Sequence, residues 1–556
     1  NQAGLAHQQQ GRWPEAASCY HQAAAEAGLE SRFMLGWLAY EQGLDAEAGA
    51  HLAAVLAAEP EFGPARLLLG KLAEAYQARN WTFHQARCLE QLLKLNPQDI
   101  RTMEKLSLAW AHLGQHEAQR ELFHRLLGIG PGGRAWATSL PPAEQARRAY
   151  NQHVYVFQYL KLLYTDPAAS DQQLFDYVDR LPDLPGQREV FAAPDPARPL
   201  RVAYLSREFA IYSSMLLFLP LLTHHSKAVE LYAYSDIKEP TAYTRALMPC
   251  FAHWRSTQSM TNAELAAQIR SDEIDILVDL AGLTHVSRYG VFARHPAPVQ
   301  VSGLGFVFSS CMRDMDYCFS DRVLCPPDIA ARYPEQVVCL CSVFHWQPPA
   351  DLAQPDPPCL QNGYLTLGSA STLNKLNPRV VALWAQILHQ LPEARLFLKT
   401  PVFNDPLTCS FYTELFARFG VKAARLRFEG QGDELHISYF YTQIDIALDP
   451  FPYQGGVTSC EALWMGVPVL SLALPQWRTR ALTAAILTHA GLQDWLAGSE
   501  TEYLERALSW AQDRDFLARQ RRELRARLLA SPICDGAGFA AEVEAAYHWM
   551  REQAGL

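Results

Sequence analysis

The sequence has no apolar run long enough to cross a membrane. A spanning helix needs about 20 consecutive apolar residues, and the run Met215–Leu219 is followed at once by Pro220. The chain begins Asn-Gln-Ala-Gly, without an initiator Met or a signal-peptide pattern. We therefore expect no membrane span, and we interpret the sequence as trimmed at its start.

Long runs of Lys and Arg are also absent. The chain carries 48 Lys and Arg against 58 Asp and Glu, a formal net charge of −10. Because proteins bind nucleic acid largely through cationic side chains placed against its phosphates, we expect no nucleic-acid partner. A local basic pocket for one diphosphate is compatible with this balance.

The 12 cysteines form no CxxC pair of the kind that holds zinc, and the nearest approach is Cys339-Leu340-Cys341. We expect no metal site from them. In a chain this large, buried reduced thiols are the expected state, and they favour a cytoplasmic protein.

The N-terminal part has the periodicity of a helical repeat. Leu35-Gly36 recurs as Leu69-Gly70, 34 residues later. The small–large–small–proline pattern of a tetratricopeptide helix pair is present at Ala48, Leu52, Val55 and Pro60. Four such units in register assign residues 1–131 to a tetratricopeptide domain. Stacked pairs of this kind form a superhelix whose concave face commonly holds a peptide or a partner protein.

The rest of the chain predicts a linker and two α/β domains. Residues 132–198 form the helical linker, with an aromatic-rich helix at Tyr150–Tyr164. Short apolar runs then alternate with helical patterns, which is typical of parallel sheets. The Pro-rich segment Pro348–Pro358 divides them into two facing, doubly wound, Rossmann-like domains, 199–350 and 351–556, which bind ligands at the carboxyl ends of their strands. The predicted strands are 200–205, 229–234, 274–280, 299–304, 365–368, 394–399, 426–429, 444–448 and 467–472.

A glycine turn inside the stretch Asp449–Pro468 predicts an anion site. The preceding strand ends at Leu448, and a helix begins soon after it. A helix N-terminus presents free N–H groups and a positive dipole, so a diphosphate fits there. The candidate donor-binding residues of this turn are Gly455, Gly456, Val457, Thr458 and Ser459, with Thr458 or Ser459 as the expected helix cap.

Glu461 lies one turn inside the same helix. Its carboxylate is placed to accept hydrogen bonds from ribose hydroxyls. The alternative is a simple glycine turn followed by an acidic residue in the first helical turn.

A second candidate is the loop Ser371–Pro378, which follows the first strand of the second α/β domain. Lys375 supplies a compact cation that neutralises a leaving diphosphate, and Thr372 is a further candidate for donor binding. The alternative is a lysine that faces solvent.

Two loops of the first α/β domain supply candidates on the other side of the cleft. Glu208 and Tyr212 lie in the loop after the first strand, where a general base facing the cleft is expected. Glu208 could equally cap the next helix. The stretch Asp279–His285 ends another strand at the same rim, and His285 could be an ordinary loop histidine.

Four stretches together resemble the family of protein O-GlcNAc transferases and plant SPINDLY-type transferases, most closely its bacterial SPINDLY-like members. They are Ile274–Gly282, Val291–Gln300, Lys375–Pro378 and Asp449–Pro468. The resemblance implies a GT-B fold, made of two facing Rossmann-like domains, after a tetratricopeptide domain. It also implies an inverting transfer from a nucleotide sugar to a protein side chain, without a metal or another cofactor.

The resemblance implies roles for single residues as well. Lys375 would contact the diphosphate, Thr458 and the neighbouring backbone would hold the phosphates, and Glu461 would bind the ribose. Glu208 matches an acidic residue of the family's first catalytic loop.

Three stretches depart from the family's pattern. Tyr212 stands where the family usually has a His, and a phenol with a pKa near 10 is a poor base at neutral pH. The loop Phe306–Cys311 is bulkier than in relatives, and Pro475–Arg480 replaces a motif that contains His-Ala. In that last segment, Arg478 or Arg480 could supply positive charge to the diphosphate.

We therefore expect a glycosyltransferase that moves a sugar from a nucleotide-sugar donor, UDP-GlcNAc as the first guess, to Ser or Thr of a protein held by the repeats. UDP, GDP and CMP sugars stay open, as does a homo-oligomeric state. The alternatives are an Asn-directed glucosyltransferase and a non-catalytic peptide-binding scaffold. Removing residues 1–130 is expected to spare donor hydrolysis and to abolish protein modification.

Overall fold

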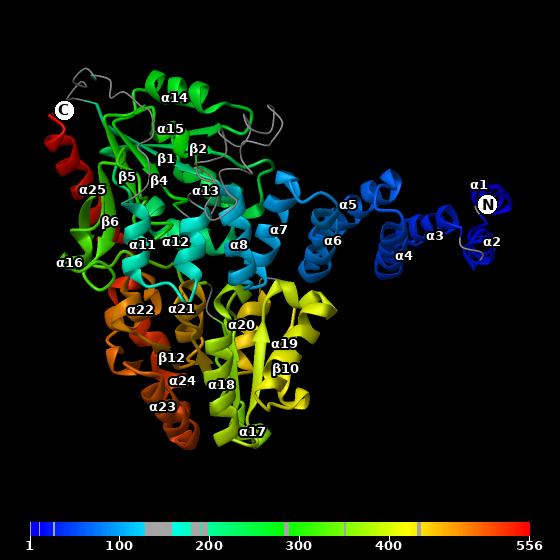
Figure 1. The fold of residues 1–556 in the computed structure, drawn as a ribbon. Helices are drawn as coiled ribbons and strands as arrows, with labels where there is room; N and C mark the ends of the chain where they lie inside the picture. The colour runs from blue at the N-terminus through cyan, green and yellow to red at the C-terminus, as the bar shows by residue number, and fades with distance from the viewer. Residues whose placement is uncertain are drawn as a thin grey trace.

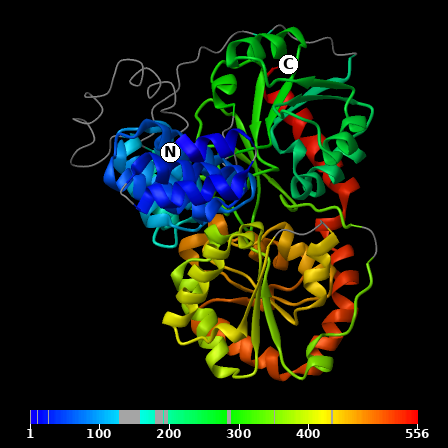
Figure 2. The same ribbon diagram turned by 90° about the vertical axis from the view of Figure 1, so that its right-hand side faces the viewer.

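The chain folds into a row of paired helices followed by two α/β domains, one on each side of a shared boundary (Figure 1). The computed structural model describes residues 2–10, 12–25, 28–127, 158–179, 191, 198–282, 288–349, 352–430 and 435–555. Figure 2 looks along the row of helices, which lies beside both domains. Among the described residues, none of the helices combines the length and the apolar character that crossing a membrane requires.

Antiparallel helix pairs build the N-terminal row. Leu35 and Leu69 are buried at equivalent places in two of these helices. A Cβ added at Gly36 would lie 3.2 Å from the Cβ of His51, so a small residue lets neighbouring helices approach. The predicted tetratricopeptide architecture is confirmed. The helices are α1 (Gln2–Gln9), α2 (Trp13–Ala25), α3 (Leu29–Glu41), α4 (Asp45–Ala58), α5 (Gly63–Ala78), α6 (Thr82–Leu95), α7 (Ile100–His112) and α8 (His116–Leu127).

The linker is described only in part. A helix covers 158–165 and α11 covers Asp171–Val178, and both pack beside the α/β domains. The N-terminal half of the predicted helix Tyr150–Tyr164 lies outside the described residues.

The first α/β domain is built on a parallel sheet of order β3-β2-β1-β4-β5-β6-β7. Its strands are β1 (Leu200–Ser206), β2 (Val229–Ser235), β3 (His253–Ser256), β4 (Ile276–Asp279), β5 (Val299–Ser302), β6 (Tyr317–Asp321) and β7 (Gln336–Leu340). Its helices are α12 (Tyr212–His224), α13 (Ala242–Leu247), α14 (Asn262–Ser271), α15 (Tyr289–Phe292) and α16 (Pro327–Ala330).

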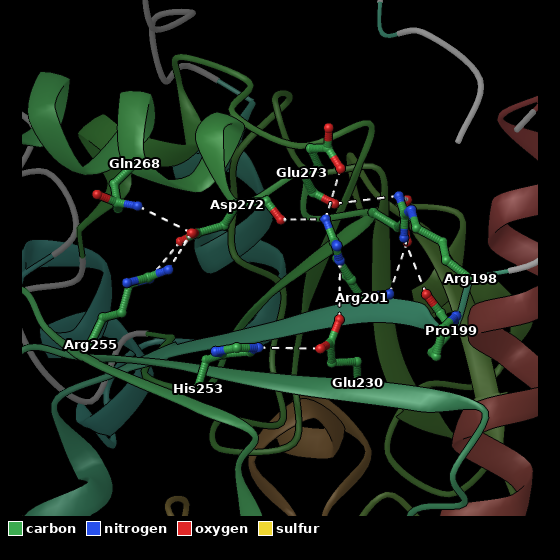
Figure 3. A network of polar contacts seen from close by, with 10 residues as sticks. Arg198, Pro199, Arg201, Glu230, His253, Arg255, Gln268, Asp272 and Glu273 are labelled. Carbon is green, nitrogen blue, oxygen red and sulfur yellow. Dashed lines mark hydrogen bonds and ion pairs between the residues drawn. The ribbon is translucent and has the colours of Figure 1, made fainter. Parts of the chain in front are cut away.

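A dense charge network closes the amino-end edge of this sheet (Figure 3). Arg201 at the start of β1 binds Glu230 at 3.1 Å and Glu273 at 2.8 Å, and Arg255 on β3 binds Asp272. Because these charges satisfy one another at the amino ends of the strands, the opposite, carboxyl-end edge is the one left for ligands.

The second α/β domain has a parallel sheet of order β10-β9-β8-β11-β12-β13. Its strands are β8 (Thr366–Ser369), β9 (Arg395–Lys399), β10 (Leu426–Glu429), β11 (Ile446–Leu448), β12 (Val469–Leu472) and β13 (Leu496–Ala497). Its helices are α17 (Cys359–Asn362), α18 (Pro378–Gln390), α19 (Pro406–Arg418), α20 (Leu435–Thr442), α21 (Val457–Trp464), α22 (Leu482–His489), α23 (Glu500–Gln512) and α24 (Arg514–Leu529).

The last helix corrects the predicted domain boundary. Helix α25 (Gly536–Gln553) leaves the second domain and returns to the first (Figure 1). Its Phe539, Val543 and Tyr547 are buried in the core of the first sheet, where the Tyr547 hydroxyl lies 3.0 Å from that of Tyr204 on β1. Assigning 351–556 as a whole to the second domain is therefore wrong, because the apolar face of α25 packs in the other core.

Candidate active site

The two predicted donor loops meet at the carboxyl-end edge of the second sheet. Strands β8 and β11 are neighbours, so the loop after β8 and the turn after β11 emerge side by side. Lys375, at the end of the short 3₁₀ helix η3 (Leu373–Lys375), donates a hydrogen bond of 2.7 Å to the carbonyl oxygen of Gln454. Its ammonium also lies 4.1 Å from the ring centroid of Tyr453, a cation–π contact.

The glycine turn is held by a buried carboxylate that the sequence analysis did not single out. Asp449 accepts hydrogen bonds from the Gly455 amide at 2.7 Å and from the Ser471 hydroxyl at 2.6 Å. A Cβ at Gly455 would collide with the Ser459 hydroxyl, and one at Gly456 would lie 2.9 Å from a methyl of Leu482. A side chain at either position would force these neighbours to shift.

Helix α21 begins at Val457 with Gly456 as its N-cap and no side-chain cap. The expectation that Thr458 or Ser459 caps the helix is wrong, because the Ser459 hydroxyl pairs with Thr483 at 2.8 Å instead. The amides of Val457 and Thr458 donate no hydrogen bond among the described residues. A hollow between β8, β11 and α21 is lined by Ser369, Ser371, Asp449, Thr458 and Ser459.

Glu461 is a buried carboxylate within this helix. The residue is 6% exposed, and among the described residues no group donates a hydrogen bond to its carboxyl group. Burial raises the pKa of Glu461 to about 8. A buried carboxyl group without a hydrogen-bond partner is costly, and holding its proton reduces that cost.

The charges beside the turn are tuned by burial. Burial lowers the pKa of Lys375 to about 8, although the nearby charge of Asp449 acts to raise it. Burial raises the pKa of Asp449 to about 6, against its hydrogen bonds and the charge of Lys375. Near neutral pH most of the Lys375 side chains carry their positive charge, and a bound diphosphate would hold that proton more firmly.

Thr372 lies at the start of η3 on an exposed part of the loop. Its hydroxyl donates to the side-chain oxygen of Asn374 at 2.5 Å. The residue is thus in the loop expected of it, with its hydroxyl already hydrogen-bonded.

Arg480 has a different place from the one expected. Its side chain is fully buried, and its guanidinium donates to Asp171 and to the carbonyl oxygens of Leu163, Tyr164, Asp166 and Ala169. These partners belong to the linker, so Arg480 joins the linker to the second domain. Arg480 therefore does not supply the positive charge that the sequence led us to expect for a diphosphate.

The first domain contributes Glu208 to the facing side. Glu208 follows β1, is buried, and accepts a hydrogen bond of 2.6 Å from the Ser214 hydroxyl. Burial, together with the charge of Glu208, raises the pKa of Tyr453 to about 12. Burial also raises the pKa of Asp279 to about 6, with a smaller contribution from Glu208. The carboxyl-end edges of the two sheets therefore share one electrostatic environment.

Two other predicted residues lie partly or wholly outside the described residues. Tyr212 begins α12, and its side chain lies outside the described part. His285 lies wholly outside the described residues.

Lys161 was missed by the sequence analysis. It lies on the linker helix 158–165, one turn before Tyr164, whose ring packs edge-on against Tyr453 at 5.2 Å. Burial lowers the pKa of Lys161, opposed by the charge of Glu208. No periodic pattern in the sequence predicts that a linker lysine lies near Glu208 and Tyr453. This placement depends on how the linker and the two α/β domains pack together.

The arrangement of possible metal ligands and the state of the cysteines can be described for the same ranges. No group of three or more His, Cys, Asp or Glu side chains in the described ranges is arranged to hold a metal ion. The 12 cysteines all fall within those ranges, and none is in a disulfide.

Known proteins share this architecture. The model of glycosyl transferase family 41 matches residues 189–348 and 363–543, and a tetratricopeptide-repeat model matches 1–64 and 71–134. A mutant of the O-GlcNAc transferase of Thermobaculum terrenum has 30% sequence identity and a TM-score of 0.76, covering 95% of this chain and 98% of that one. The expected GT-B fold after a tetratricopeptide domain is confirmed.

Two plant proteins are similar over the α/β part. Both are named probable UDP-N-acetylglucosamine–peptide N-acetylglucosaminyltransferase SPINDLY. The one from Arabidopsis thaliana is 33% identical over 371 residues, 64% of this chain and 40% of that protein. The one from Oryza sativa subsp. japonica is 32% identical over 368 residues, 64% of this chain and 39% of that protein. The chain thus spans about two fifths of these relatives, and the match of the family model to both α/β domains shows that it belongs to glycosyltransferase family 41.

Proposed function

We propose that this chain transfers a sugar from a nucleotide-sugar donor to a protein held by its helical repeat. The observation that carries the proposal is the position of Lys375, whose ammonium lies at the glycine turn before α21. The same turn leads into α21, where the amides of Val457 and Thr458 donate no hydrogen bond among the described residues. Glu461 lies within the same helix, and its buried carboxyl group accepts no hydrogen bond from the described residues. A cation, free helix amides and a carboxyl group without a partner together suit a nucleoside diphosphate.

This geometry supports the following donor-binding roles. Lys375 and the amides of Val457 and Thr458 hold the diphosphate, and Glu461 accepts hydrogen bonds from the ribose hydroxyls. UDP-GlcNAc is the proposed donor, supported by the names of the similar plant proteins.

The proposed reaction is an inverting displacement. The hydroxyl oxygen of an acceptor Ser or Thr attacks the anomeric carbon, the bond from that carbon to the phosphate oxygen breaks, and the nucleoside diphosphate leaves. Negative charge grows on the leaving phosphate, so the Lys375 ammonium and the helix amides stabilise the transition state without a metal ion. The acceptor proton leaves to Glu208 or, through water, to solvent.

The repeat supplies the acceptor in this proposal. Paired helices stack into a curved surface of the kind that binds extended peptides, and the row lies beside both α/β domains (Figure 2). We place the reaction in the cytoplasm, since the unpaired cysteines suit a reducing compartment.

The test is a transfer assay with the full chain, UDP-GlcNAc and a library of peptides rich in Ser, Thr and Asn. The proposal expects release of UDP and a mass increase of one N-acetylhexosamine on Ser or Thr. Modification at Asn would replace the proposed acceptor with the Asn-directed alternative. A folded chain that neither releases nucleotide nor modifies any peptide, with UDP-, GDP- and CMP-sugars alike, would favour the scaffold.

A further inference from the structure

The helical repeat touches the loop that carries Lys375. The turn between α7 and α8 contains Gly114, whose φ is +68°. A Cβ added to Gly114 would lie 2.5 Å from the carbonyl oxygen of Leu373 and 3.5 Å from the Cα of Asn374. Both residues belong to η3, the short helix that ends at Lys375. The repeat therefore lies in van der Waals contact with the backbone that presents the donor lysine.

Two side chains fix this contact from either side. The Tyr412 hydroxyl, on α19 of the second domain, donates to the carbonyl oxygen of Leu113 at 3.3 Å, and this bond is buried. On the repeat side, His116 is buried with its ring beside the backbone of Gly114 and Asn374. Burial lowers the pKa of His116, which leaves it neutral and suited to close packing.

A second anchor holds the repeat to the same domain. Asp405 is fully buried and caps α19, accepting from the Leu407 amide at 2.9 Å. The same carboxylate accepts from the amides of Phe83 and His84 at the start of α6, at 2.8 and 3.2 Å, and from the His84 ring at 2.7 Å. One carboxylate thus serves a helix of the repeat and a helix of the donor-side domain, which prevents the two from sliding past one another.

We propose that the Leu113–Gly114 turn is a positioning contact for Lys375. The turn packs against η3 from the side of the repeat and holds it where the Lys375 ammonium reaches the Gln454 carbonyl and the Tyr453 ring. The repeat then has two tasks, recruiting the acceptor and shaping the donor site. This inference rests on the proposed function. It also replaces the expectation that removing residues 1–130 spares donor hydrolysis, because that deletion removes the support of η3.

Gly43 offers a matched control. It occupies the equivalent turn, between α3 and α4, and its φ is +72°. An added Cβ there meets only the end of the Arg79 side chain, at 4.0 Å. Gly43→Ala and Gly114→Ala therefore impose similar backbone strain within the repeat, and only Gly114→Ala presses on η3.

The experiment measures UDP-GlcNAc binding by calorimetry for the full-length wild type, Gly43→Ala and Gly114→Ala, with thermal unfolding of each. We expect at least a fivefold loss of affinity in Gly114→Ala and an unchanged affinity in Gly43→Ala. If Gly114→Ala does not fold, Tyr412→Phe, which removes only the bond to Leu113, takes its place with the same expected direction.

A double-mutant cycle with Lys375→Ala separates positioning from general damage. If the turn acts through Lys375, the loss caused by Gly114→Ala disappears in the Lys375→Ala background. Equal affinity of Gly114→Ala and wild type, or an undiminished loss in that background, would overturn the inference and leave the proposed function standing. A wild type that binds no nucleotide sugar would overturn both.

Discussion

The ammonium of Lys375 donates a hydrogen bond to the carbonyl oxygen of Gln454, 79 residues further along the chain. This bond joins the loop after β8 to the glycine turn before α21, across two neighbouring parallel strands. Burial has lowered the pKa of the lysine to about 8, so the site holds a partly desolvated cation before any ligand arrives. A desolvated cation interacts more strongly with a phosphate than a solvated one does.

Replacing Glu461 by Gln is expected to change how stability depends on pH in the absence of nucleotide. The folded pKa of about 8 exceeds the ordinary value of 4.5, so the folded state binds this proton more tightly than the unfolded state. The stability contributed by that proton is present below pH 4.5 and is lost as pH rises towards 8. Within this window the group contributes a slope of up to about 1.4 kcal/mol per pH unit.

Chemical denaturation between pH 4.5 and 8 measures the free energy of unfolding of wild type and of Glu461→Gln. The variant is expected to gain stability relative to wild type as pH rises, while the exposed Glu505→Gln follows wild type. If the plots of unfolding free energy against pH are parallel for wild type and Glu461→Gln, the Glu461 carboxyl is not desolvated.

Replacing Lys375 by Arg tests the charge of the proposed donor site. In the wild type, affinity for UDP-GlcNAc is expected to fall as pH rises above about 8, because the ammonium loses its proton. An Arg side chain keeps its charge throughout this range. Calorimetric titrations from pH 7 to 10 should therefore show a decline in the wild type and a weaker but level affinity in Lys375→Arg. The same decline in both proteins would exclude Lys375 as its source.

Replacing Arg480 by Ala is expected to damage stability rather than donor binding. Removing one partner of a buried ion pair typically costs about 3–5 kcal/mol, because Asp171 is left buried without its counter-charge. Denaturation measures this loss, and calorimetry on the folded protein should show donor affinity close to wild type. Arg478→Ala, at a largely exposed ion pair with Asp328, serves as the control with little effect on either. Full stability with lost donor affinity would return Arg480 to the donor site.

Chelation tests the proposed metal-free transfer. Because Lys375 and the α21 amides are proposed to stabilise the leaving diphosphate, excess EDTA is expected to leave the rate of UDP release unchanged. The measurement compares initial rates with and without EDTA, followed by addition of Mg²⁺ or Mn²⁺. A rate that EDTA abolishes and a divalent ion restores would contradict this mechanism.

The sequence predicted the architecture well where local patterns repeat. All nine predicted strands are present, and most of them are apolar runs buried in a parallel sheet; the edge strand β10 (Leu426–Glu429) is partly exposed. The strands β3, β6, β7 and β13 were missed. The sequences His253-Trp-Arg-Ser256 and Tyr317-Cys-Phe-Ser-Asp321 mix polar and apolar residues, and Leu496–Ala497 is too short to show a period.

The proximity of the two candidate loops was predictable, because each of them follows the end of a strand. The glycine turn and Lys375 stand next to strand ends, so topology alone brings them to one edge. The role of Arg480 was misjudged because, from the sequence alone, an arginine that binds the linker looks the same as one that would bind a phosphate. Only packing shows that Asp171, more than 300 residues earlier, is its partner. The contact of Gly114 with η3 is hidden in the sequence for the same reason.

Calorimetric binding of UDP-, GDP- and CMP-sugars to the full chain, with Lys375→Ala as the control, is the most direct test of the proposed donor site. We predict selective binding of one nucleotide class, with UDP-GlcNAc as the expected donor. We also predict a loss of affinity of at least tenfold in Lys375→Ala, without loss of the folded state. Binding that is equal in wild type and Lys375→Ala, or no binding of any nucleotide sugar by the folded chain, would contradict the proposed donor site.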